Sequence, residues 1–344
     1  MPITGYPGPF STFIPNHEAT GKLVINYSRN PKDFALNQYV TISPVKQIAG
    51  YYLRLTPENA ARILSAGAKD QLWPPGQDAP TGHWETEALD WTQYSCLRYA
   101  TPWAIDQLSV DNASWAILDV IRAQRAHNRM TARAEVVLQK LQDASLWGSH
   151  TDTATNLGGG KFDQGTPTSP YLKKGLQAAA LRINKDTLGV VTTKDLIVVM
   201  SPETAARVSQ SQEVHTYLKE SPFALAQIRG DVESQNGVWG LPDTLYGFKI
   251  VVEDAVKITT PKGATNPNNQ YVLDPDNILI LARPGGLVSF GGPNFSTVHL
   301  FFYEEMQVEE KYDADNRVHR GRIVDTFAAE LVSSVSGFLI TDVL

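Results

Sequence analysis

The chain has 344 residues with a net charge of −6, and 42% of its residues are hydrophobic. This length allows two or three domain-sized units with a sizeable core. The acidic balance argues against a dedicated nucleic-acid binder, so any contact with nucleic acid must be local. A single cysteine, Cys96, excludes intramolecular disulfides and fits assembly in a reducing cytoplasm. No apolar run is long enough to span a bilayer, and no membrane partner is expected.

Residues 1–35 are predicted to form an arm that becomes ordered by lying on its own subunit or on another copy. Prolines and glycines interrupt any regular element there, yet the stretch is too rich in aromatic and aliphatic residues for a free linker. The next segment alternates in strand fashion around 39–42 and 51–55. A proline at a first helical position then predicts a short helix over 56–67.

Tryptophans are concentrated in the loop-rich, acidic stretch that follows. Trp73, Trp84 and Trp91 lie among carboxylates, and rings of this size need a surface to bury against. They pack either on their own domain or on a neighbouring subunit. The second interpretation makes them candidate subunit contacts.

Residues 109–147 contain neither proline nor glycine and are predicted to form one long helix. Ser109, Asp111 or Asn112 can cap its start, and Gly148 can end it. At 1.5 Å per residue it would be roughly 55 Å long, where helices average about three turns. Its apolar face rotates along its length. We therefore predict a long structural helix whose two ends pack against different parts of the protein. It would be neither a core helix nor a coiled-coil helix.

A basic stripe follows one side of this predicted helix, about a quarter turn from its apolar face. The stripe contains Arg122, Arg125, Arg129, Arg133 and Lys140, and the apolar face of the same half contains Met130, Ala134, Val137, Leu138 and Leu141. The arginines are either solvated or they contact neighbouring subunits or a polyanion. Because the net charge disfavours strong DNA binding, we favour subunit contacts, with weak phosphate contact second.

Helices and apolar strands alternate in the following part of the chain, after a predicted exposed loop at 148–169. The expected elements are helix 171–185, strand 196–200, helix 203–219, a helical or loop segment at 223–228, strand 245–253, loop 259–270 and strand 277–282. This order indicates an α/β unit around a small sheet at 188–295.

Two long strands, 298–312 and 317–331, are predicted around a turn at 313–316, with an apolar closing segment at 335–343. A ribbon of this length needs support from other elements or other chains.

Opposite charges face each other across this predicted ribbon and help to set its register. The predicted turn would place Glu309 near Arg320 and Glu310 near His319. The charged candidates for subunit contact are Glu309, Glu310, Arg317, Arg320 and Arg322.

Catalytic patterns are missing from the sequence. It has no HExxH motif, no cysteine pair and no GxSxG motif, and its seven histidines are scattered. Cys96 has no activating signature and is interpreted as a packed residue. The sequence nominates no catalytic, cofactor-binding or metal-binding residue, and we expect no enzyme activity.

The order and spacing of these elements resemble the major capsid proteins of tailed bacteriophages, whose Hong Kong 97-like fold encapsulins share. The resemblance covers nearly the whole chain. It is carried by LIVVMSPETAARVSQSQEV (196–214), LYGFKIVVEDAV (245–256), NILILARPGGLVSFGGPNF (277–295) and the ribbon at 298–343. It implies an α+β fold with an N-terminal arm (1–35), an extended β-loop (36–95), a peripheral domain with a spine helix (96–187, helix 109–147), an axial domain (188–297) and a peripheral β-ribbon with closing strand (298–344).

The same resemblance implies a structural major capsid protein of the virion, assembled in the host cytoplasm into hexamers and pentamers of an icosahedral or prolate head around double-stranded DNA. Its partners would be further copies of itself, packaged DNA by weak non-specific contact, and portal, scaffolding and decoration proteins, with no cofactor. Two alternatives stay open: an encapsulin-type compartment around a protein cargo, and an α/β enzyme with a pocket within 188–295.

Overall fold

The computed structural model describes residues 33–54, 75, 91–113, 116–187, 189–260, 265–266, 268–284 and 296–344. These residues form two compact units, a smaller one with segments 98–130 and 306–325 and a larger one with segments 32–97, 131–305 and 326–344. Most of the predicted arm and the predicted helix at 56–67 lie outside the described residues.

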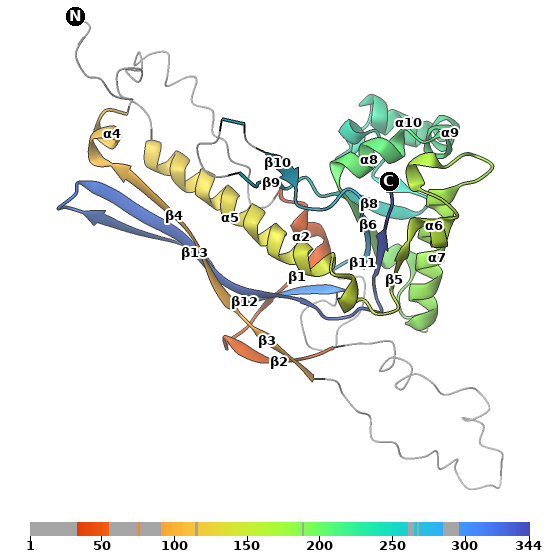
Figure 1. Ribbon diagram of the computed structural model, residues 1–344, viewed down its shortest axis with the longest axis horizontal. Coiled ribbons are helices and arrows are strands. Elements are labelled where there is room, and N and C mark those ends of the chain that lie inside the picture. Colours follow the sequence, from red (N-terminus) through yellow and green to blue (C-terminus); the bar gives the residue numbers. More distant parts are fainter. Residues whose placement is uncertain are drawn as a thin grey trace, which may run out of the picture. The chain divides into compact units, whose positions relative to one another are not determined.

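A six-stranded mixed sheet forms the centre of the larger unit (Figure 1). Its strands, in spatial order, are β5 (Thr151–Thr153), β14 (Phe338–Thr341), β11 (Ile278–Ala282), β6 (Leu196–Met200), β8 (Phe248–Val252) and β7 (Thr244–Leu245). Every residue of β6 and β11 is buried, as their continuous apolar sequences predict. The sheet also includes β5 and β14, which lie outside the range 188–295 assigned to this unit from the sequence.

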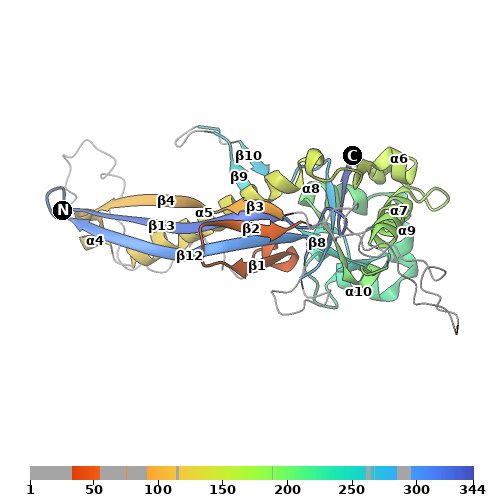
Figure 2. The same cartoon turned by 90° about the horizontal axis from the view of Figure 1, so that it is seen from below.

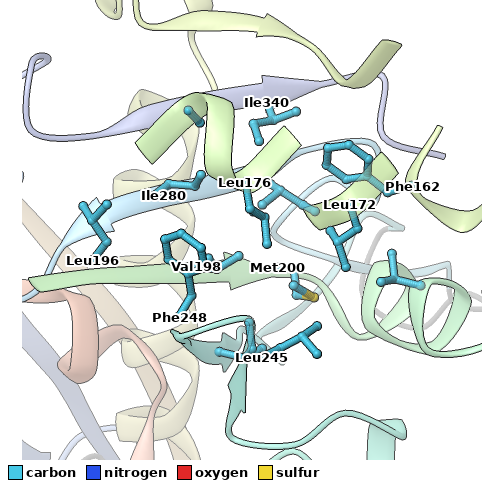
Figure 3. Packing of buried hydrophobic residues seen from close by; sticks show 14 of the residues in the cluster. Phe162, Leu172, Leu176, Leu196, Val198, Met200, Leu245, Phe248, Ile280 and Ile340 are labelled. Carbon is cyan, nitrogen blue, oxygen red and sulfur yellow. The ribbon is translucent and has the colours of Figure 1, made fainter. Parts of the chain in front are cut away.

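Helices gather around this sheet (Figure 1). They are α6 (Ala154–Gly158), α7 (Tyr171–Asp186), α8 (Pro202–Ser209), α9 (Gln212–Glu220) and α10 (Pro222–Arg229), with short 3-10 turns at Phe162–Gln164, Thr193–Asp195 and Gly237–Trp239. Figure 3 shows Leu172 and Leu176 of α7 packed with Val198 and Ile340 of the sheet in one hydrophobic core. The helix predicted at 171–185 is confirmed, and the segment at 223–228, predicted as helix or loop, is helical.

Three sequence-based predictions for this unit are wrong in detail. The helix predicted at 203–219 is two helices, because the Ser211 side chain accepts the Val214 N–H at 3.3 Å and caps a second start. The strand predicted at 245–253 is broken by a turn at Tyr246 and Gly247, whose φ angles are +53° and +90°. The region 148–169 is not an exposed loop, since it contains β5 and α6 and buries Phe162 completely.

A second sheet is built around the predicted ribbon (Figure 2). Its spatial order is β1 (Val40–Pro44), β12 (Val298–Asp313), β13 (Val318–Leu331) and β4 (Leu97–Asp106). A short helix, α2 (Leu36–Tyr39), precedes β1, which pairs in parallel with the first residues of β12. The two-stranded sheets are β2 (Ala49–Leu53) with β3 (Trp91–Ser95), and β9 (Val256–Ile258) with β10 (Asn269–Tyr271). Both long strands of the ribbon are confirmed.

The predicted helix at 109–147 is shorter than expected. Helix α4 (Gln107–Asp111) begins after Asp106, whose side chain accepts the Leu108 N–H at 3.0 Å, and α5 covers Ile117–Leu141. At 1.5 Å per residue, α5 is about 37 Å long. Its predicted apolar face is confirmed, because Met130, Ala134, Val137, Leu138 and Leu141 are all buried.

Two side chains set the end of α5. Asp143 accepts the Ser145 N–H at 3.0 Å and starts a separate 3-10 turn, Ala144–Leu146. The buried indole of Trp147 donates to the Leu141 carbonyl at 2.8 Å, which satisfies one of the carbonyls left open at the helix end.

Replacing Gly175 with alanine should destabilise the larger unit. A Cβ atom at this position of α7 would overlap the fully buried ring of Phe162. We expect the overpacking to cost about 1–3 kcal/mol, reduced by up to about 1 kcal/mol of helix propensity. Urea unfolding of G175A against Q177A, an exposed position on the same helix, measures the difference. An unchanged G175A midpoint would show that the Phe162 ring has room to move.

Candidate functional site

Two arginines of the predicted basic stripe are buried inside the chain. In the smaller unit, Arg129 Nε lies 2.9 Å from Asp325 Oδ1, and the two side chains are 4% and 0% exposed. The Arg129 guanidinium also lies 4.8 Å from the centre of the Tyr99 ring. The interpretation of Arg129 as a solvated or freely accessible cation is therefore wrong.

Arg133 is buried in the larger unit, with 8% exposure. Its guanidinium carbon lies 4.6 Å from the centre of the Phe302 ring and 5.7 Å from that of Phe327. A guanidinium over an aromatic face is attracted to the negative centre of the ring. Arg133 thus joins α5 to β12 and β13 within one subunit.

A signal for these contacts is present in the sequence. Asp325 stands in the strand IVDTFAAEL, where it is surrounded by apolar residues. A carboxylate within a buried strand needs a cation or several donors. The polar residue in the apolar strand, together with the arginines of the helix, could have indicated an internal ion pair.

The remaining basic residues of α5 are less buried. Arg122 is half-buried and forms ion pairs with Glu310 and Asp119 in the smaller unit. The Arg122 hydrogen bond lowers the pKa of Glu310, while desolvation opposes this shift. Lys140 pairs with Glu330 at 2.7 Å in the larger unit, and Arg125 is half-buried.

The ion pairs of the ribbon differ from the predicted pairing of Glu309 with Arg320. Arg322 binds Glu309 at 2.5 Å, while Arg320 binds Asp313 at 3.1 Å. The His319 ring lies 4.8 Å from the Tyr312 ring, and its charge contributes to the lowered pKa of Glu310.

The predicted Glu309–Arg320 pairing is therefore wrong, and the turn explains the difference. The link between the strands covers 314–317, one residue later than predicted, and Asp313 accepts the side-chain amide of Asn316 at 2.9 Å. Arg317 takes a left-handed φ of +50° there, and its carbonyl accepts the Gln107 N–H at 2.8 Å.

The β2–β3 hairpin of the larger unit has one packed face. Tyr52 and Tyr94 point to the Phe301 ring of β12, with ring centres 5.5 and 4.7 Å from it. Cys96, beside them, is buried, and its thiol lies 3.4 Å from the Phe301 carbonyl. This side of the hairpin belongs to the core of the subunit.

The other face of the same hairpin is bare and largely apolar. Leu53 pairs directly with Trp91 across the two strands, and Tyr51 follows on the same face. Tyr51, Trp91 and Leu53 are 68%, 59% and 38% exposed. We call Tyr51, Leu53 and Trp91 the hairpin apolar face. Trp91 is thus not packed on its own domain, while Trp73 and Trp84 lie outside the described residues.

Groups suited to metal binding or membrane insertion do not occur in the described part of the chain. No cluster of three or more His, Cys, Asp or Glu side chains there could hold a metal ion. Among the same residues, no helix combines the length and the apolar character needed to cross a bilayer.

The fold is similar to solved structures of phage proteins. A phage-related protein from Bordetella bronchiseptica RB50 matches with a TM-score of 0.56 and 15% identity, over 92% of this chain and 94% of that one. The capsid structure of the cyanophage P-SCSP1u matches with a TM-score of 0.54 and 10% identity, over 98% and 95%. A structure from Mycobacterium phage Bobi matches with a TM-score of 0.53 and 11% identity, over 93% of each chain.

These likenesses place the chain in the class of Hong Kong 97-like capsid folds, as the order of its elements predicted. Helix α5 lies within the range predicted for the spine helix, and the β2–β3 hairpin lies within the range predicted for the extended β-loop. No protein-family model and no curated protein matches the chain. The exact limits of the predicted arm, loop, peripheral and axial regions stay a prediction.

Replacing Arg129 with leucine should strongly destabilise the subunit, because it removes a charged partner from the buried Asp325 carboxylate. The expected loss is about 3–5 kcal/mol in the free energy of unfolding. The control is R122L, which breaks a half-exposed pair on the same helix and should cost at most about 1 kcal/mol.

Urea unfolding of both variants and of the double variant R129L/D325L distinguishes the causes. The double variant should recover part of the loss, because it removes the buried carboxylate together with its cation. Equal losses for R129L and R122L would contradict the buried-pair interpretation.

Proposed function

We propose that this protein is a structural shell subunit, a phage major capsid protein that assembles with further copies of itself into a closed head. The fold supports this proposal, since one of the similar solved structures is a cyanophage capsid. The strongest support for the proposal is the hairpin apolar face. One face of the hairpin packs in the core of the subunit while the other is exposed, so the exposed face is suited to lie on a second copy.

The composition of this face fits a contact between subunits better than exposure to solvent. Tyrosine and tryptophan together with leucine supply large contact area, and aromatic residues are enriched in interfaces. Ile48 and Leu97, just outside the two strands, are 49% and 59% exposed and extend the same apolar character. In a symmetric shell each copy would offer this hairpin to one neighbour and receive one from another.

Within this proposal the chain has a non-enzymatic role in the virion, assembled in the host cytoplasm. The head would contain double-stranded DNA, held by weak non-specific contact, and would meet portal, scaffolding and decoration proteins. Arg129 and Arg133 are withdrawn as candidates for DNA or subunit contact, because both are buried in the subunit. Trp73, Trp84, Arg125 and the exposed charges of the ribbon stay proposed contacts.

Electron microscopy of the purified chain tests the proposal. We expect closed shells with hexameric and pentameric units under assembly conditions, and nuclease-protected DNA in shells from infected cells. A monomer or small oligomer under every condition would refute the shell. Shells that enclose a protein and no nucleic acid would instead indicate an encapsulin-type compartment.

The double variant L53S/W91S should fold and yet fail to assemble. Trp91 is mostly exposed and Leu53 is partly exposed, so the free energy of unfolding of the unassembled chain should fall by no more than about 1–2 kcal/mol. Loss of the apolar face should lower the yield of shells at least tenfold in sedimentation and microscopy.

The matched control is Q93A, a polar position on the same face of β3. It should assemble normally. Unchanged assembly of L53S/W91S would remove the hairpin apolar face from the proposed interface, while a collapse in the stability of the subunit would show that the face packs within it.

A further inference from the structure

A buried histidine lies at the joint between the second sheet and the hairpin. His299 of β12 is 6% exposed and stands opposite Thr41 of β1 in the parallel register. Its Nδ1 atom is 2.9 Å from the Ser43 Oγ atom of β1, and its Nε2 atom is 3.3 Å from the Ser296 backbone nitrogen. Both ring nitrogens therefore have a partner in the larger unit.

These partners determine the protonation state of the ring. A backbone N–H can only donate, so Nε2 must keep its lone pair to accept from Ser296. The proton of the neutral ring is then on Nδ1 and is donated to the Ser43 hydroxyl. A second proton on Nε2 would face the Ser296 N–H, and that hydrogen bond would be lost. Both hydrogen bonds can therefore form only while the imidazole is neutral.

His299 lies where the chain enters the hairpin. One residue after β1, the Val45 N–H donates to the Phe302 carbonyl at 2.8 Å and continues the contact with β12. On the other side, the His299 ring lies 6.1 Å from that of Phe301, on which Tyr94 of the hairpin stacks. The ring thus contacts β1 directly and the packed face of the hairpin through Phe301.

The other titratable groups packed around Phe301 do not change charge in the acid range. They are Tyr52 and Tyr94 on the hairpin and Cys96 next to it, all packed around Phe301. Burial raises the pKa of both Tyr94 and Cys96, so they stay protonated on acidification. Glu330 of β13 acts electrostatically on Cys96 and is paired with Lys140. Burial lowers the pKa of His299 to about 4.

We propose that His299 is an acid-sensitive lock, which holds β1 and the base of the hairpin on β12 while neutral and releases them when it is protonated. The lock would control how firmly the hairpin apolar face is held on its own subunit. It rests on the contacts of one subunit and does not require that the chain forms a shell.

The direction of the pH effect follows from the lowered pKa. An unfolded histidine titrates near pH 6.5, so the contribution of the lock is complete above that pH and is lost as the pH falls toward about 4. The joint is closed when β1 and the base of the hairpin are held on β12, and open when they are released. Each pH unit of acidification between these values lowers the ratio of closed to open joint by up to about tenfold. Between pH 6.5 and pH 4.5 the ratio should therefore fall by up to about 100-fold.

Hydrogen exchange of the full chain, corrected for the intrinsic effect of pH, tests the lock. The Val45 amide should lose about 10–100-fold protection between pH 7 and pH 4.5, while the Val198 amide of the six-stranded sheet serves as the internal reference. In H299Q the side-chain amide can accept from Ser296 and donate to Ser43, but it does not titrate. Its Val45 protection should stay nearly constant over the same range.

Direct titration of the His299 ring by NMR keeps the proposal testable if H299Q does not fold. A midpoint near pH 4 supports the lock, and a midpoint at or above 6.5 overturns it. The variant S43A, which removes the acceptor of Nδ1, should lower Val45 protection already at pH 7. Equal pH dependence of Val45 in H299Q and in the unchanged chain would also overturn the proposal.

Discussion

The attachment of α5 to the ribbon through two buried arginines is the contact on which the rest of the structure depends. Arg129 meets Asp325 of β13, and Arg133, one turn later, lies over Phe302 and Phe327. A buried ion pair need not add net stability, because desolvation offsets much of the attraction. It does penalise every arrangement in which one partner lacks the other. The pair therefore specifies which part of the helix lies on which part of the ribbon.

The hairpin depends on that arrangement. Its packed face lies on Phe301 of β12. The next residue, Phe302, has the Arg133 guanidinium over its ring. Its base is held by β1, which pairs with the same stretch of β12. Within the larger unit, the contact of Arg133 with Phe302 helps to set the position of the neighbouring Phe301 and His299 of the same strand. The hairpin can then present Tyr51, Leu53 and Trp91 on its other face without loss of its own support.

Much of the fold could be predicted because the strongest patterns are local. The buried strands Leu196–Met200 and Ile278–Ala282, the helix Tyr171–Asp186 and the two long ribbon strands all follow from continuous or periodic apolar residues. Element ends were predicted less well, since they depend on single hydrogen bonds. Examples are the Ser211 cap between α8 and α9 and the Asp143 contact that separates α5 from the next turn. The predicted pairing of Glu309 with Arg320 was wrong, because the charges allow several pairings and the turn geometry selects among them.

The sequence by itself determined the order of the elements, the apolar face of α5 and the resemblance to capsid proteins, since these depend on spacing along the chain. The tertiary structure alone decided what the arginines do. Arg122 and Arg129 both belong to the basic stripe predicted from the sequence, yet Arg122 is half-exposed and Arg129 is buried. The reason is that the exposure of a cation depends on what another segment brings to it, here Asp325 from a strand nearly two hundred residues away. The same holds for Trp91, whose exposure results from the packing of Tyr52 and Tyr94 on the opposite face of the hairpin.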